Sequence, residues 1–202
     1  RLSVDGLGQT NFNIWKHRYL FGNNQLAVFT RGRIAAYLTL EHARYWNGER
    51  VKPYTELALQ ELYDSIDLLI HPDGSFLEGP GYFFYTISSI QPVLQMYANV
   101  RNKNLREIIP EKMKLLGAFA DTLVSTDRRG GLIPFSSGQG EGRFGGINTI
   151  QFLAAVAPDS QWTTMYHTLL REKFADRLIA DPGFWILRSQ IPENDPPLKP
   201  FS

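Results

Sequence analysis

The sequence contains no cysteine, and its charges almost cancel, because 21 lysines and arginines face 20 aspartates and glutamates and leave a formal net charge of +1. The absence of cysteine excludes a disulfide scaffold, a catalytic thiolate and a zinc site with cysteine ligands. The charge balance leaves no bulk positive field for non-specific binding to phosphate groups. No apolar run approaches the roughly 18 residues needed to cross a bilayer. We therefore expect a globular protein that binds neither nucleic acid nor a membrane.

Other common signatures of chemistry are also missing. The histidines, His17, His42, His71 and His167, are scattered without the paired spacing of a metal site. The serines lack the G-x-S-x-G context of a nucleophile elbow. The glycine-rich stretch 130–146 lacks the GK[ST] ending of a phosphate-binding loop. We expect no metal ion, no cofactor and no nucleotide.

A helical pattern runs through most of the chain, because apolar residues recur at steps of three and four. The predicted helices cover residues 26–46, 53–70, 87–97, 108–123, 147–156 and 162–174, with Pro92 expected to kink or loosen the third. Short connections between helices indicate antiparallel αα-hairpins. Bulky residues at 184–187 favour one β-strand, and the proline-rich tail 191–202 is typical of a linker. The predicted fold class is all-α with one strand near the C-terminus.

Antiparallel helices bring the segments that enter alternate helices to one end of the array. Those segments are 21–24, 73–82 and 130–146, and the last two are rich in glycine. Glycine lets a backbone approach a ligand closely, and loops held by a rigid scaffold commonly carry function. We therefore expect one rim of the helical array to hold the functional residues.

Residues 73–85 combine acidic, glycine and aromatic residues in one short segment. One interpretation is a loop whose glycines form turns, whose aromatic side chains enter the core and whose Glu78 caps the next helix. The other assigns proton transfer to Tyr82 or Tyr85, since a phenol needs nearby positive charge or donated hydrogen bonds to act as a base. The candidate cations lie elsewhere in the chain, at Arg31, Arg33 and Arg143.

Three amides, Asn23, Asn24 and Gln25, lie beside the start of the first predicted helix. An asparagine at this place commonly caps a helix N-terminus. Alternatively, one amide hydrogen-bonds a substrate carboxylate and stabilises negative charge that develops there. His71 is the histidine that adjoins the segment 73–85, so it is a further candidate.

Three segments resemble motifs of the heparinase II/III-like polysaccharide lyases, a family that includes related alginate lyases. Residues 73–85 are similar to the family's segment DGS-aromatic-x-EG-x-x-Tyr-x-x-Tyr. Gly22-Asn23-Asn24 is similar to its Gly-Asn-His or Gly-Asn-Asn helix start, and residues 181–189 are similar to its D-x-G-aromatic-x-x-L-R-S strand. The motifs occur in the family's order and together extend over nearly the whole chain.

The resemblance implies an enzyme that cleaves a uronic-acid-containing polysaccharide by β-elimination outside the cytoplasm, as a secreted or periplasmic protein. It also implies that residues 1–180 form part of an incomplete (α/α) toroid and that residues 181–202 form a linker or the start of a β-sandwich. By the same resemblance, Tyr82 transfers the proton, and Asn24 or Asn23 neutralises the uronate carboxylate. The resemblance assigns substrate binding or orientation of the loop to Glu78 and Tyr85, and substrate binding also to Arg143. His71 is a substrate-binding candidate because it adjoins this loop.

The chain departs from the family pattern in three ways. Asn24 stands where many relatives have histidine, and the family's His-x-His-x-Asp segment does not occur. Few helices precede Phe21 for a complete toroid, which is the third departure. In addition, the sequence opens on Arg1 without a basic and then apolar leader. These departures predict a fragment of a larger enzyme.

Two other functions remain open at the level of sequence. An (α/α)-barrel glycoside hydrolase needs two carboxylic acids about 5 to 10 Å apart, and Glu78 with Glu141 or Asp73 is the available pair. A non-catalytic carbohydrate-binding helical domain needs only exposed aromatic and polar side chains. Unsaturated products would favour the lyase, and reducing sugar without unsaturation would favour the hydrolase.

Overall fold

A computed structural model describes residues 22–123, 147–171 and 191–197. The chain divides into two compact units, which are described separately below. Unit 1 comprises Arg1–Leu69 and Ser89–Ile109, and unit 2 comprises Ile70–Ser88 and Pro110–Ser202. The described residues are mostly helical and contain no strand longer than an isolated bridge, which confirms the all-α class. The strand expected at 184–187 lies outside the described residues.

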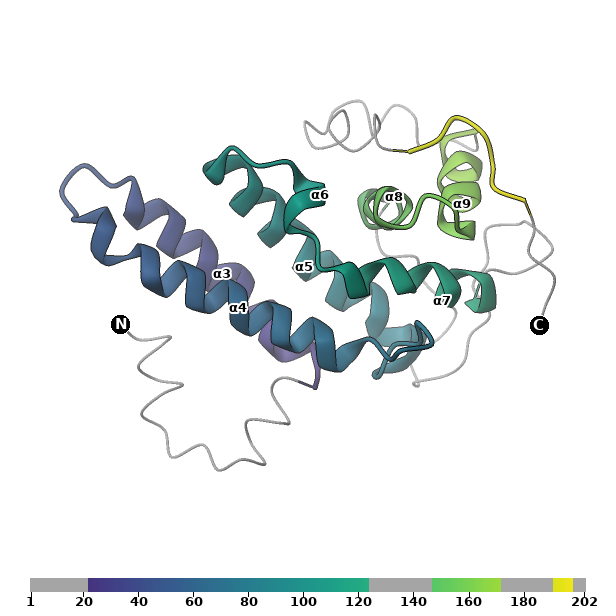
Figure 1. The fold of residues 1–202 in the computed structure, drawn as a ribbon, viewed down its shortest axis with the longest axis horizontal. Helices are drawn as coiled ribbons and strands as arrows, with labels where there is room; N and C mark the ends of the chain where they lie inside the picture. The colour runs from purple at the N-terminus through teal and green to yellow at the C-terminus, as the bar shows by residue number, and fades with distance from the viewer. Residues whose placement is uncertain (1–21, 124–146, 172–190, 198–202) are drawn as a thin grey trace. The chain divides into compact units, whose positions relative to one another are not determined.

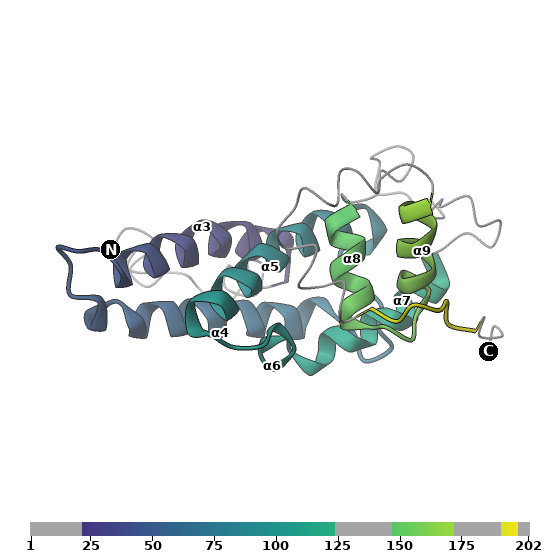
Figure 2. The same cartoon turned by 90° about the horizontal axis from the view of Figure 1, so that it is seen from above.

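Unit 1 is built on a helical hairpin. Helix α3 (Asn24–Glu41) and helix α4 (Lys52–Leu69) run side by side and are joined by a short connection that contains the 3-10 turn η1 (Gly48–Arg50) (Figure 1 and Figure 2). The C-terminal part of helix α5 (Gly79–Arg101) and helix α6 (Leu105–Ile108) complete the unit. Apolar side chains at intervals of three and four, among them Leu59, Leu62 and Ile66, are buried along α4. The stripe that predicted this helix therefore faces the core.

The first predicted helix ends earlier than expected. The sequence pattern extended it to residue 46, whereas α3 ends at Glu41 and His42 forms its C-cap. The chain then turns back so closely that a Cβ on Gly48 would lie 2.1 Å from the carbonyl oxygen of Glu41. Only glycine fits at this approach, and a helix that continued to Trp46 would prevent it.

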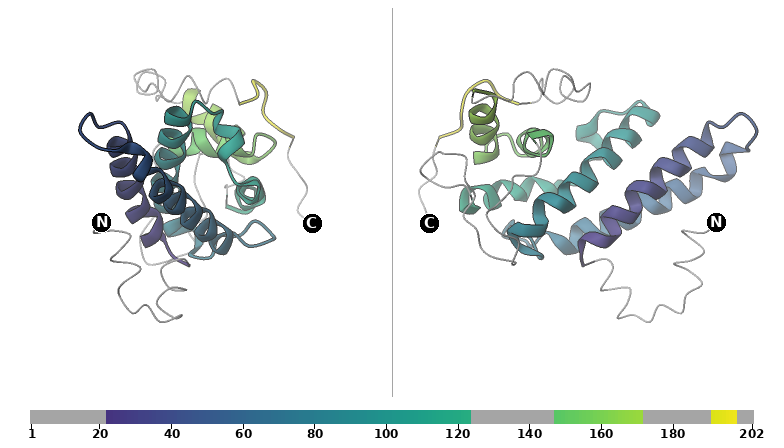
Figure 3. Two further views of the ribbon diagram at one scale, coloured as in Figure 1. Left: turned by 60° about the vertical axis from the view of Figure 1, so that its left-hand side comes forward. Right: turned by 180° about the vertical axis from the view of Figure 1, so that it is seen from behind.

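Unit 2 contains the N-terminal part of α5, the 3-10 turn η2 (Glu111–Leu115), and helices α7 (Leu116–Leu123), α8 (Ile147–Val156) and α9 (Gln161–Leu169). Figure 3 shows α8 and α9 from two further directions. Ser160 caps α9 by accepting a hydrogen bond from the backbone N–H of Trp162, and α8 occupies the residues predicted for it. The predicted helix 162–174 is confirmed as far as α9 extends, and residues 172–174 lie outside the described residues.

Aromatic side chains form the core of unit 2. The ring of Phe83 lies 5.2 Å from Phe76, 4.9 Å from Phe119 and 5.7 Å from Trp162, measured between centroids. The indole N–H of Trp162 donates a 2.8 Å hydrogen bond to the carbonyl oxygen of Leu116, so its polar atom is satisfied. Aromatic residues make up 13% of the sequence, and several of them therefore serve to pack this core.

The apolar stripe at 108–123 does not form one helix, which corrects the prediction. Helix α6 ends at Ile108, and Ile109 is extended, with φ −71° and ψ 122°. Proline disfavours the helical conformation in the residue before it, so Pro110 separates α6 from η2 and α7. By contrast, Pro92 lies inside α5, which continues to Arg101.

Candidate functional site

The segment that begins the 73–85 motif is a tight turn in unit 2. The backbone N–H of His71 donates to the carbonyl oxygen of Ser75 at 2.9 Å, and Ile70 and Phe76 form an antiparallel bridge. Gly74 adopts a φ of +85°, and a Cβ there would lie 2.2 Å from the carbonyl oxygen of Leu115. The turn therefore requires glycine for its conformation and for its packing.

The side chain of Asp73 stabilises this turn through hydrogen bonds to a residue of the same turn, and it is exposed to solvent. Its carboxylate accepts hydrogen bonds from the backbone N–H and the hydroxyl of Ser75, at 2.9 and 2.7 Å. These bonds, with a smaller contribution from the charge of His71, hold the pKa of Asp73 below its ordinary value. Asp73 is therefore suited to remain ionised and not to donate a proton as a general acid. His71 itself is exposed beside the turn.

Glu78 lies just before helix α5. Its carboxylate accepts a 3.2 Å hydrogen bond from the hydroxyl of Thr86, a buried residue two turns into the helix. Gly79, the first residue of α5, has a φ of +70°. The interpretation of this segment as a loop with turn-forming glycines is thus confirmed in part, and Glu78 supports the start of α5 through Thr86.

The aromatic residues of the motif divide into two groups by burial. Phe76, Phe83 and Phe84 are almost completely buried in the core of unit 2. Tyr82 and Tyr85 are 37% and 52% exposed on the first turns of α5. Residues three apart share a helix face, so the two tyrosines lie next to each other on the outside of this helix. The phenylalanines fix the segment, and the tyrosines are accessible to a ligand.

Asn23 and Asn24 belong to unit 1 and have different environments. Asn23 is the N-cap of α3, and its side-chain oxygen accepts a 2.9 Å hydrogen bond from the backbone N–H of Gln25. Asn24 occupies the first helical position and is half-buried, and within the described part of the chain its side chain makes no hydrogen bond. Asn23 therefore serves as a helix cap, whereas the amide of Asn24 has no hydrogen-bond partner among the residues that the structure describes.

The remaining predicted residues lie in different parts of the chain and have different environments. Arg143 and Glu141 lie outside the described residues. Arg33 is buried in unit 1, where its guanidinium forms an ion pair with Glu61 of α4. Arg31 is exposed on α3. Of the three arginines considered as sources of positive charge for a tyrosine, Arg33 is therefore already paired with a carboxylate.

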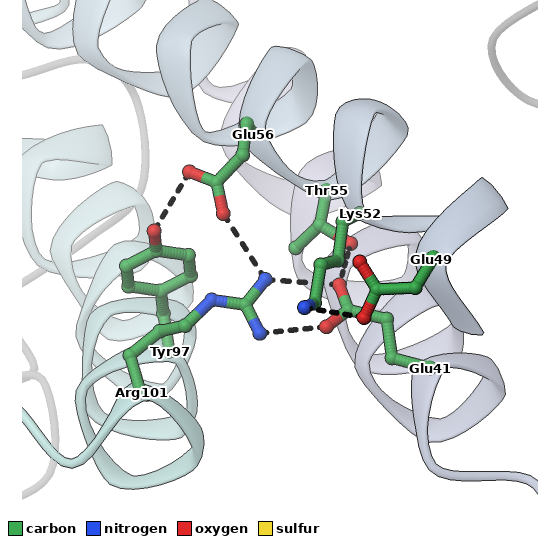
Figure 4. A network of polar contacts seen from close by, with 7 residues as sticks. All are labelled: Glu41, Glu49, Lys52, Thr55, Glu56, Tyr97 and Arg101. Atoms are coloured by element: carbon green, nitrogen blue, oxygen red, sulfur yellow. Dashed lines mark hydrogen bonds and ion pairs between the residues drawn. The ribbon is translucent and has the colours of Figure 1, made fainter.

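A polar network in unit 1 was missed by the sequence analysis (Figure 4). Arg101, near the end of α5, donates two hydrogen bonds to the buried carboxylate of Glu41, at 2.6 and 2.9 Å, and one to Glu56 at 3.0 Å. Thr55 also donates to Glu41, and Tyr97 donates to Glu56 at 2.7 Å. The network therefore links the ends of α3 and α5 with the start of α4.

The pKa shifts of Glu41 and Arg101 explain why both groups of this network stay ionised. Burial raises the pKa of Glu41, but hydrogen bonds from Arg101 and Thr55 and the charge of Arg101 outweigh burial and leave the pKa below its ordinary value. The hydrogen bonds to Glu41 raise the pKa of Arg101 in turn. Burial and the neighbouring Glu56 carboxylate raise the pKa of Tyr97. Glu41 and Arg101 therefore remain an ion pair at neutral pH, and Tyr97 remains a neutral donor.

Unit 1 contains a second buried polar group on α3. The Nε and Nη1 atoms of Arg33 and the hydroxyl of Thr30, one turn earlier, have no hydrogen-bond partner among the described residues. Glu61 satisfies only the Nη2 atom of that guanidinium. Buried donors without partners are costly, so the ion pair with Glu61 is the main compensation for burying this charge.

The described residues contain no cluster of histidine, aspartate and glutamate side chains able to hold a metal ion. Within the same ranges, no helix has the length and apolar character that crossing a membrane requires. The described residues therefore form a mostly helical protein, with the tyrosine and carboxylate candidates in unit 2 and the amide candidate in unit 1. Comparisons with protein-family models, curated proteins and solved structures find no match.

Proposed function

We propose that the chain is part of a polysaccharide lyase that cleaves a uronic-acid-containing polymer by β-elimination. The observation that carries the proposal is the division of the 73–85 motif, in which the phenylalanines are buried and Tyr82 and Tyr85 are exposed. The exposure of both phenols leaves them able to contact a ligand, which proton transfer by Tyr82 requires. The proposed architecture is an incomplete (α/α) toroid formed by residues 1–180, followed by a linker or the start of a β-sandwich.

The chemistry requires removal of the proton at C5 of a uronate, beside a carboxylate whose negative charge opposes further charge. In the proposal, the amide of Asn24 donates a hydrogen bond to this carboxylate and stabilises the charge that develops in the transition state. Tyr82 transfers the proton to the leaving glycosidic oxygen and serves as the base or assists it. The C4–O bond breaks, and a double bond forms between C4 and C5.

The other residues have supporting roles in this proposal. Tyr85 lies one turn from Tyr82 and offers a second phenol to a sugar ring. Glu78 anchors the start of α5 through Thr86 and so fixes the position of Tyr82. His71 and Arg143 would bind acidic groups of the substrate. Asn23 acts indirectly, because its cap sets the first turn of α3 on which Asn24 lies.

A matched pair of variants tests the role of Tyr82. Tyr82→Phe and Tyr85→Phe each remove one hydroxyl from an exposed ring of the same helix, so neither should alter the fold. With heparan sulfate or alginate as substrate, we expect Tyr82→Phe to reduce kcat by at least about a hundredfold, the lower range for a proton-transfer group. Tyr85→Phe should change mainly KM. The measurement is ultraviolet absorbance of the unsaturated uronate product.

Three outcomes would contradict the proposal. The first is the absence of unsaturated product from every uronate polymer tried. The second is release of reducing sugar without unsaturation, which would indicate the hydrolase. The third is equal activity of Tyr82→Phe and the unaltered chain. Asn24→Ala gives an independent check. On a uronate polymer, this variant should lose more in turnover than in binding affinity.

A further inference from the structure

The connection between α3 and α4 carries large exposed aromatic side chains that neither the core nor the candidate site uses. We define the tip as residues 42–50. Tyr45 is 93% exposed and Trp46 is 58% exposed, and Tyr45 is the most exposed of the large apolar side chains in the described ranges. Exposing an aromatic ring of this size to water is unfavourable and suggests a binding role.

The tip is held in a defined conformation. The backbone N–H of Trp46 donates to the carbonyl oxygen of Ala43 at 3.1 Å, and that of Arg50 donates to Asn47 at 3.1 Å. The backbone of Gly48 lies directly against Glu41, whose carboxylate is clamped by Arg101 (Figure 4). Because these contacts order the loop before any ligand arrives, binding there would cost less conformational entropy than binding to a free loop.

The charges of the tip favour an anionic ligand. The side chains of Arg44 and Arg50 are exposed and have no hydrogen-bond or ion-pair partner among the residues that the structure describes. The one carboxylate within the tip, Glu49, forms a 2.6 Å ion pair with Lys52. The two free guanidinium groups are thus the dominant charges beside Tyr45 and Trp46, and such groups bind carboxylate and sulfate in bidentate geometry.

The polar groups of the tip favour a sugar ligand over a membrane surface. Its aromatic side chains carry a hydroxyl and an indole N–H, and Asn47 adds an exposed amide. No leucine, isoleucine, valine, methionine or phenylalanine occurs within residues 42–50, so the tip offers no large aliphatic side chain to an acyl chain. Aromatic faces with nearby hydrogen-bond donors suit a sugar ring, whose faces are apolar and whose edges are polar.

We propose that the tip is an auxiliary binding surface for an acidic polysaccharide, with Tyr45 and Trp46 stacking on sugar rings and Arg44 and Arg50 binding their carboxylate or sulfate groups. The ligand class rests on the proposed function, but the binding surface is made of residues that the candidate site does not include. Its role would be to retain the polymer between catalytic events.

The experiment measures binding of the full chain to immobilised alginate, heparin and dextran, and to vesicles of anionic phospholipid. We expect the double variant Tyr45→Ala, Trp46→Ala to bind alginate or heparin about tenfold more weakly, and Arg44→Gln, Arg50→Gln to lose binding in a salt-dependent manner. Dextran should bind weakly to all variants. Phe29→Ala is the matched control, because Phe29 is 61% exposed in the same unit but lies outside the tip.

The outcomes separate this inference from the proposed function. Weaker polymer binding by the tip variants supports the inference even if no polymer yields unsaturated product, because binding and elimination are measured independently. Unchanged binding in both double variants overturns it, even if Tyr82→Phe abolishes turnover. Preferential binding to the vesicles also overturns it. Circular dichroism with unchanged thermal midpoints shows that a loss of binding does not come from unfolding.

Discussion

The two units of the chain are stabilised by different kinds of interaction. Unit 1 contains ion pairs that are wholly or partly buried, between Glu41 and Arg101 and between Arg33 and Glu61. Unit 2 is built around the rings of Phe83 and Trp162, with their aromatic neighbours. Apolar packing stabilises at any pH, whereas a buried ion pair depends on the charge of both partners. The difference predicts that the units respond differently to substitution and to acid.

The largest expected effect is the loss of Phe83 in unit 2. Phe83→Ala removes a fully buried ring that contacts other rings, and we expect the free energy of unfolding to fall by about 3–5 kcal/mol. Urea unfolding followed by circular dichroism measures this change. Phe83→Leu is the control and should lose less, because it leaves a smaller cavity. If Phe83→Ala cost below about 1 kcal/mol, the ring would not be central to unit 2.

The next largest effect is expected in unit 1, from Arg101→Met. This change keeps much of the side-chain volume but leaves the carboxylate of Glu41, which is 2% exposed, without its cation. We expect a loss of about 3 kcal/mol in the free energy of unfolding. Hydrogen exchange measured by mass spectrometry should show faster exchange in α4 and little change in α8.

A double variant checks that the loss comes from the unpaired charge. Adding Glu41→Gln to Arg101→Met replaces the carboxylate with a neutral group and should recover part of the lost stability. If the double variant were less stable than Arg101→Met alone, Glu41 would contribute through interactions other than this ion pair.

The smallest effect is a difference in acid sensitivity. The folded pKa of Glu41 lies below its ordinary value of 4.5, so its ionised form stabilises unit 1 fully above pH 4.5. That contribution is lost as the pH falls from 4.5 through the lower folded pKa. We expect exchange in α4 to accelerate in this range more than exchange in α8, and Arg101→Met should weaken the dependence. Equal acceleration in both helices would contradict the comparison.

Local sequence patterns predicted the helices whose stripe is continuous and whose ends carry clear signals. Residues 53–70 and 147–156 were predicted to within a residue, because their apolar spacing and flanking stop signals agree. The stripe at 108–123 was wrongly predicted to form one helix, because the prediction followed its apolar spacing and ignored the helix-ending effect of Pro110. The end of α3 was misplaced because a contact between Gly48 and Glu41 is tertiary and leaves no periodic signal.

The candidate site was predictable only in part. The motif 73–85 drew attention to Tyr82 and Tyr85, but spacing alone did not separate them from the buried Phe83 and Phe84. The ion pair between Glu41 and Arg101 joins residues 60 positions apart, and nothing local in either segment indicates the partner. The exposed tip was likewise visible only once the end of α3 was known.

Glu41 links two properties that selection could otherwise change independently. Its carboxylate belongs to the network that stabilises unit 1, and its carbonyl oxygen lies against the glycine that shapes the tip. Substitutions at Trp46 or Arg44 should alter polymer retention alone, and substitutions at Tyr97 should alter stability alone. Changes at position 41 should alter both, so the effect of a mutation in the tip would depend on which residue occupies that position.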